Sequence, residues 1–96
     1  MRRKETQKIS DVLKEFTQSS KMRSRLQETQ LIENWGRTLG PVIAGATGKI
    51  YIKDRTLFVN IESAVIKNEL FMIRTQIRDA LNKSVGEAII DNIIFR

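Results

Sequence analysis

The chain has 96 residues, contains neither histidine nor cysteine, and carries a formal net charge of +6. Without these two residue types it lacks the usual general base, the thiolate nucleophile and the commonest transition-metal ligands, which excludes Ser-His-Asp and Cys-His catalysis. The length fits one domain, and no apolar run approaches the roughly 18 residues that a membrane span needs. We therefore expect a cytoplasmic protein that is not an enzyme, with no metal, no cofactor, no small-molecule substrate and no contact with membranes.

The positive charge is concentrated at the N-terminus. Residues 1–25 hold eight Lys or Arg and three Asp or Glu, a net of +5, whereas residues 26–96 have a net of +1. A basic end of this kind suits phosphate backbones, acidic protein surfaces or anionic lipid, although it can also be a merely solvated end. We predict a basic, flexible arm over residues 1–8 and a single domain over residues 9–96.

The first periodic segment predicts an amphipathic helix that begins near Thr6. Its apolar residues, which share one face at helical spacing, are Ile9, Val12, Leu13 and Phe16. The pair Ser19-Ser20 then interrupts the pattern, and this predicts a break in the helix.

A second helix is expected over residues 21–39. Its apolar stripe consists of Leu31, Trp35 and Leu39, with Leu26 one turn earlier to help cover it. Because Trp35 lies on this stripe, we interpret it as a core anchor rather than a platform for stacking. Gly40 and Pro41 are typical of a helix C-terminus and predict where this helix ends.

Residues 40–49, GPVIAGATGK, have the composition of a phosphate-binding loop. The lysine is out of register with the G-x-x-x-x-G-K-[ST] pattern, and the stretch leads from helix to strand rather than from strand to helix, which excludes a nucleotide site. Residues 45–48 also match the G-x-x-G string of KH domains, but that loop joins two helices. We interpret these glycines as a helix stop and a sharp re-entry into a sheet.

From Ile50 the apolar period changes to two, which predicts a β-hairpin with Asp54-Arg55 as its turn. The residues expected on its core-facing side are Ile50, Ile52, Leu57, Val59 and Ile61. Ser63 is the expected N-cap of a third helix, and Gly86 is expected to end it. The apolar stripe of that helix consists of Ile66, Leu70, Ile73, Ile77 and Leu81. The β-branched residues of 88–96 predict a final strand.

These elements predict an α+β domain with the order α-α-β-β-α-β and a small three-stranded sheet packed on helices. A helical crossover usually makes the two strands that it joins parallel. Whether the final strand lies beside the first or the second strand stays open.

The third helix also carries a basic line. At 100° per residue, Lys67, Arg74 and Arg78 fall within about 40° of one another, and Phe71 lies beside them. Such a line can follow phosphates while the aromatic ring stacks on a base. The alternative is an ordinary solvated shoulder, because Glu69 and Asp79 on the same helix dilute its field.

The chain resembles the DciA family, named for bacterial proteins thought to precede the DnaC-type loaders of the replicative helicase. The resemblance rests on the order and spacing of short elements: Trp35, Gly40, Ile43-Ala44, Thr47, Thr56–Ile61, Ser63-Ala64, Asn68–Leu70, Leu81-Asn82, Gly86 and Ile93–Arg96. It extends from about Ile9 to Arg96. It implies a KH-like α+β fold, DNA binding and interaction with a DnaB-type replicative helicase.

The leading hypothesis is a DNA-associated adaptor that binds single-stranded or forked DNA and a DnaB-type helicase, in the cytoplasm or at the nucleoid. The basic residues expected to contact phosphates are Arg2, Arg3, Lys4, Lys8, Lys21, Arg23, Arg25, Lys67, Arg74 and Arg78. One alternative is a protein-interaction module without nucleic acid, whose interface would be formed by Val65, Phe71 and Met72. Another is an RNA-binding KH-like protein.

Overall fold

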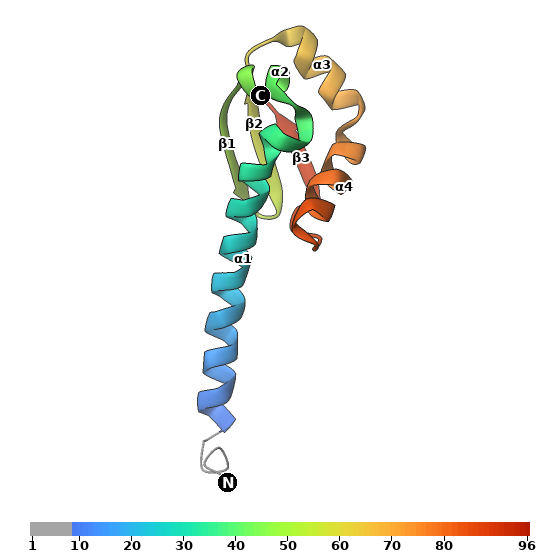
Figure 1. Cartoon of the computed structure of the whole chain (residues 1–96). Coiled ribbons are helices and arrows are strands. Elements are labelled where there is room, and N and C mark those ends of the chain that lie inside the picture. Colours follow the sequence, from blue (N-terminus) through green and yellow to red (C-terminus); the bar gives the residue numbers. More distant parts are fainter. Residues whose placement is uncertain (1–8) are drawn as a thin grey trace.

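The computed structural model describes the backbone of residues 9–96 and the side chains of residues 21–96 (Figure 1). The predicted arm over residues 1–8 and the side chains of the first predicted apolar stripe, Ile9 to Phe16, lie outside the described residues. The elements are α1 (Ile9–Leu39), α2 (Pro41–Gly45), β1 (Thr47–Lys53), β2 (Thr56–Ile61), α3 (Ala64–Met72), α4 (Arg74–Val85) and β3 (Asn92–Phe95). The predicted α+β class and three-stranded sheet are confirmed.

Helix α1 is one continuous helix of 31 residues, so the break predicted at Ser19-Ser20 is wrong. Serine lowers helix stability only modestly per residue, and two serines are therefore not enough to end a long helix. Its first half projects well beyond the sheet (Figure 1). No helix within residues 9–96 has the length and apolar content needed to cross a bilayer.

The stretch 40–49 joins α1 to the sheet. Gly40 (φ 96°) and Pro41 end α1 as predicted, but the next residues form the short helix α2 rather than a simple turn. Trp35 is 3% exposed, which confirms it as a core anchor. Its indole Nε1 donates to Thr47 Oγ1 (2.9 Å), and that hydroxyl donates to the carbonyl of Ile43 (2.7 Å). This chain of hydrogen bonds connects α1, α2 and β1 while satisfying the buried indole N–H.

The sheet has the order β1-β2-β3. Strands β1 and β2 are antiparallel and are joined by Asp54 and Arg55, whose φ angles of 51° and 59° are those of a type I′ turn. Strand β3 pairs with β2 in parallel, so the crossover places it beside the second strand rather than the first. It covers only Asn92–Phe95, shorter than the segment 88–96 predicted from composition.

The core lies between one face of the sheet and the helices α1 and α4 (Figure 1). Its buried residues are Leu31, Trp35, Leu57, Val59, Ile61, Leu70, Ile77, Leu81, Ile89, Ile90 and Ile93. Asn82 holds the segment before β3 against this core, because its amide Nδ2 donates to the carbonyl of Ile90 while its Oδ1 accepts from the backbone N–H groups of Ile89 and Ile90.

The predicted third helix is two helices, α3 and α4, separated at Ile73. Ile73 was expected on the apolar stripe but is 45% exposed, because the break turns it out of the core. The predicted caps are confirmed: Ser63 Oγ accepts from the N–H of Ile66 (3.3 Å), and Gly86 ends α4 in the left-handed conformation. Leu26 was expected to cover the apolar stripe of α1 but is 64% exposed. At this level of α1, Arg23 and Gln27 are the residues that face the domain, because both donate to the carboxylate of Glu87.

Candidate nucleic-acid interface

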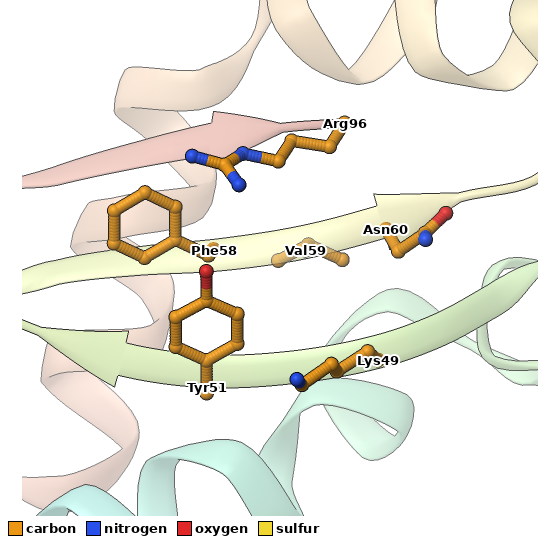
Figure 2. A pocket seen from close by; sticks show the side chains of 6 residues that line it. All are labelled: Lys49, Tyr51, Phe58, Val59, Asn60 and Arg96. Atoms are coloured by element: carbon orange, nitrogen blue, oxygen red, sulfur yellow. The ribbon is translucent and has the colours of Figure 1, made fainter.

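One face of the sheet is left uncovered by the helices. Its residues follow from the pairing register, because side chains that pair across strands with Tyr51 and Phe58 point away from the core. They form three rows of three: Lys49, Tyr51 and Lys53 on β1; Thr56, Phe58 and Asn60 on β2; Asn92, Ile94 and Arg96 on and after β3. We call these nine residues the open sheet face. Figure 2 views it with the helices behind the strands.

Two aromatic rings occupy the centre of the open sheet face. Tyr51 and Phe58 are directly paired across β1 and β2, and their rings stack with centroids 4.9 Å apart and planes 11° apart. Figure 2 shows the faces of both rings turned outward. A flat, outward-facing aromatic pair on a sheet is the kind of platform on which single-stranded nucleic acids stack their bases.

A cation lies near each ring. The Nζ of Lys49 is 5.3 Å from the centroid of Tyr51, and the guanidinium carbon of Arg96 is 4.9 Å from the centroid of Phe58. These four residues, with Asn60 and Val59, line a shallow hollow of about 170 Å³ (Figure 2). The hollow therefore combines ring faces, two positive charges and one side-chain amide.

The charge of the open sheet face has one sign. Lys49, Lys53 and Arg96 contribute three positive charges, and none of the nine residues is acidic. Glu62 marks one end of the face, where a side chain built at Gly48 would lie 3.6 Å from its carboxylate. An uncovered surface with positive charges and exposed rings can hold phosphates and bases together.

The basic residues predicted on the third helix are arranged differently. Because that helix breaks at Ile73, Lys67 lies on α3 while Arg74 and Arg78 lie on α4, and the single line of cations expected on one continuous helix does not form. Arg78 is already engaged, since it donates to the Asp79 carboxylate (2.9 and 3.0 Å) and to the carbonyl of Asp91 (3.2 Å). Arg74 lies over Phe71, with its guanidinium carbon 4.1 Å from the ring centroid.

The remaining predicted phosphate contacts lie toward the N-terminus. Arg2, Arg3, Lys4 and Lys8 are outside the described residues. Lys21, Arg23 and Arg25 lie on α1 with exposed side chains, and Arg23 forms a 3.5 Å ion pair with Glu87. These residues therefore lie on a different helix from Lys67 on α3 and from Arg74 and Arg78 on α4.

The residues predicted as a partner interface are all exposed on or just after α3. Met72 and Val65 are 79% and 69% exposed, Phe71 is 53% exposed, and Ile73 adds to the same corner. We call Phe71, Met72, Ile73 and Arg74 the α3–α4 corner. Among residues 9–96, no three His, Cys, Asp or Glu side chains come together as metal ligands would.

Arg55 and Asp91 form a bidentate ion pair between the hairpin turn and the start of β3. Arg55 Nε and Nη2 each lie 2.9 Å from one oxygen of the carboxylate, and Nη2 also donates to the carbonyl of Ala88 (2.8 Å). The hydrogen bond from Arg55 lowers the pKa of Asp91, and the same contact raises the pKa of Arg55. This pair fixes the parallel strand at the hairpin end of the sheet.

The open sheet face contains none of the residues that were predicted to bind nucleic acid. The signal for it was present, because Tyr51, Lys53, Phe58 and Asn60 alternate with the core residues of the hairpin. Arg96 could not be assigned to this face before the parallel pairing of β3 was known.

The family described as "Dna[CI] antecedent, DciA" matches residues 8–95, nearly the whole chain, and confirms the resemblance noted from the sequence. No curated protein matches the chain.

Proposed function

Because the chain belongs to the DciA family, which implies a role of the helicase-loader type, we propose that it is a cytoplasmic, non-enzymatic adaptor that binds DNA and a DnaB-type helicase. The family match supports the loader-type role for the domain as a whole. The DNA contact and the helicase contact are the two parts of the proposal that need separate support and separate tests.

The open sheet face is the observation that carries the DNA contact. It combines three cations, two outward rings and no acidic side chain among its nine residues. The basic residues of the arm and of α1, from Arg2 to Arg25, would add phosphate contacts outside it. Such contacts release counterions from the nucleic acid, and the affinity must therefore fall steeply as salt rises.

Fluorescence anisotropy with labelled single-stranded, forked and duplex DNA tests this part. We expect binding at low salt, and a plot of log affinity against log salt with a slope of about −0.7 for each phosphate neutralised on a single strand. Single-stranded RNA of the same sequence is the comparison for the RNA-binding alternative. Absence of DNA binding at micromolar protein and low salt, or clear preference for RNA, would contradict the DNA contact.

The exposed apolar residues on α3 favour a second contact, with protein. Val65 and Met72 lie among the most exposed apolar side chains of the described residues, and such side chains are enriched where partners bind. Affinity capture from cytosol with and without nuclease separates the two contacts. Recovery of the helicase after nuclease treatment, with its loss in a Val65→Ser/Met72→Ser variant, would assign the helicase contact to this surface.

A further inference from the structure

The ring faces on the open sheet face are occupied by cations that are not tied to acidic groups. Within the described residues, no ion pair or side-chain hydrogen bond involves Lys49 or Arg96, whereas each lies near a ring of the Tyr51–Phe58 pair. A cation–ring contact at an exposed site stabilises less than the stacking of a base on the same ring. An incoming base can therefore displace the cation from the ring, and the released cation is then close to the phosphate of that base.

We infer that the open sheet face is a stacking site for one or two unpaired bases of a single strand, centred on Tyr51 and Phe58. In the bound state the bases lie on the ring faces, while Lys49 and Arg96 move from the rings to the flanking phosphates. The inference rests on the proposed DNA contact and assigns that contact to base stacking on two aromatic rings.

The size and lining of the hollow fit this ligand. An apolar cavity of about 150 Å³ holds one benzene molecule, and the hollow of about 170 Å³ beside the rings is large enough for one ring of a base. Asn60 lies at its edge with a donor and an acceptor that can meet the edge of a base (Figure 2).

The same features disfavour duplex DNA at this site. In a duplex the faces of the bases are covered by their neighbours, and only groove edges and phosphates are accessible. Outward-facing rings on a sheet gain nothing from a duplex, whereas a single strand can turn its bases onto them. The phosphate contacts of Lys49 and Arg96 would serve either form, so the rings determine the selectivity.

The test separates stacking from charge with the full chain and a labelled thymidine oligonucleotide. Tyr51→Ile and Phe58→Ile keep an apolar side chain suited to a strand but remove the ring. We expect each to weaken single-strand binding by between about 5-fold and 150-fold, with an unchanged salt slope. Lys49→Gln and Arg96→Gln should instead each reduce the magnitude of the slope by about 0.7. Lys83→Gln, an exposed lysine on α4 outside the site, is the charge control.

Circular dichroism and thermal melting establish that each variant folds. An independent readout that needs no variant is photocross-linking of the wild-type protein to an oligonucleotide with 5-iodouracil. Cross-links at Tyr51 or Phe58 support the inference, and cross-links confined to α1 or α4 overturn it. Binding of single-stranded RNA with the same affinity as single-stranded DNA is also consistent with stacking, because RNA bases would stack on the same ring faces.

Two other outcomes are distinguishable. If the wild-type protein binds single strands and the two isoleucine variants bind them equally well, the stacking site is wrong while the proposed DNA contact stands. If the wild-type protein binds no DNA in any form, the proposed function itself fails. If duplex DNA at equal concentration displaces the bound single strand, the inferred selectivity of the site for single strands is wrong.

Discussion

Within residues 21–96 cations lie over aromatic rings in two regions, the open sheet face and the α3–α4 corner, and the two regions differ in what surrounds these contacts. On the open sheet face, Arg96 lies over Phe58 in a flat row with Tyr51 and Lys49. At the α3–α4 corner, Arg74 lies over Phe71, and its Nη1 also donates to the carbonyl of Phe71 (3.2 Å). The same pair of side chains is available to a ligand in the first case and is held by its own backbone in the second.

The difference follows from secondary structure. A strand presents every second side chain to the same face, so neighbouring strands place rings and cations in one plane. A helix turns successive side chains through 100°, and near the break at Ile73 the cations of α4 find local acceptors such as Asp79. Of these two regions, the sheet is therefore the one whose cations and rings lie together in one plane, whereas the corner is the one with the more exposed apolar side chains, such as Met72 at 79%.

The largest expected effect comes from releasing the segment that leads from α4 to β3, the strand that brings Arg96 to the open sheet face. Asn82→Ala removes three hydrogen bonds that hold the segment between α4 and β3, each worth about 1 kcal/mol, so the free energy of unfolding should fall by about 3 kcal/mol. Urea denaturation measures it, with Lys83→Ala as the neighbouring control. A loss below about 0.5 kcal/mol would mean that β3 reaches the sheet without this clamp.

Charge reversal should separate the two regions directly. The double variant Lys49→Glu/Arg96→Glu is expected to weaken single-strand binding at least about 25-fold at 0.1 M salt, because each lost phosphate contact costs about 5-fold there. Arg74→Glu/Arg78→Glu should change it by less than about threefold, since long-range effects of exposed charges are screened. Equal losses in the two double variants would show that the basic residues of α4 bind DNA as well, as first expected from the sequence.

A smaller effect is expected on the covered side of β1. Thr47→Val keeps the shape of the side chain but leaves the buried N–H of Trp35 without its acceptor, which should lower the free energy of unfolding by about 1.5 kcal/mol. Thermal unfolding monitored by Trp35 fluorescence measures it. Because the change lies on the core side, single-strand affinity at a temperature where the variant is folded should stay as in wild type. A loss of affinity in the folded variant would mean that the two sides of β1 are coupled.

The smallest effect concerns pH. The pKa of Asp91 is lowered in the folded state by Arg55, so its contribution to stability is present above the ordinary value of 3.8 and is lost as the pH falls through the lowered pKa. The stability of Asp91→Asn should therefore approach that of wild type as the pH falls below that value. Denaturation midpoints at several acidic pH values check this. A constant difference between the two proteins down to pH 2 would show that the pair does not respond to protonation of Asp91.

Local patterns predicted most of the fold. The hairpin with its core-facing side, the caps at Ser63 and Gly86, and the buried Trp35 follow from period, capping chemistry and size. The continuity of α1 and the break at Ile73 did not follow, because both depend on tertiary packing that outweighs weak local preferences. The pair Ser19-Ser20 was predicted to end a helix, and Ile73 was predicted to be buried because it lies on the apolar stripe of the third helix.

The candidate site was harder to predict than the fold. The sequence pointed to the N-terminal residues and to the third helix, because their basic residues lie close together along the chain. Among the cations of the open sheet face, Arg96 is far in sequence from Lys49 and Lys53. The open sheet face depends on pairing between Tyr51 and Phe58 and on the parallel placement of β3, which brings Arg96 to Phe58 across 38 residues. A site built from three strands is visible only once the order of the strands is known.

Helix α1 has a length that bears on the proposed DNA contact. From Ile9 to Trp35 it rises by about 39 Å at 1.5 Å per residue, and its first turn lies far from the sheet (Figure 1). Basic side chains of α1 such as Lys21, about 21 Å along the helix from Trp35, would therefore meet a different stretch of a strand from the one held at the sheet. Oligonucleotides too short to span both would bind through one contact only, whereas longer ones would gain avidity above a threshold of length that the helix sets.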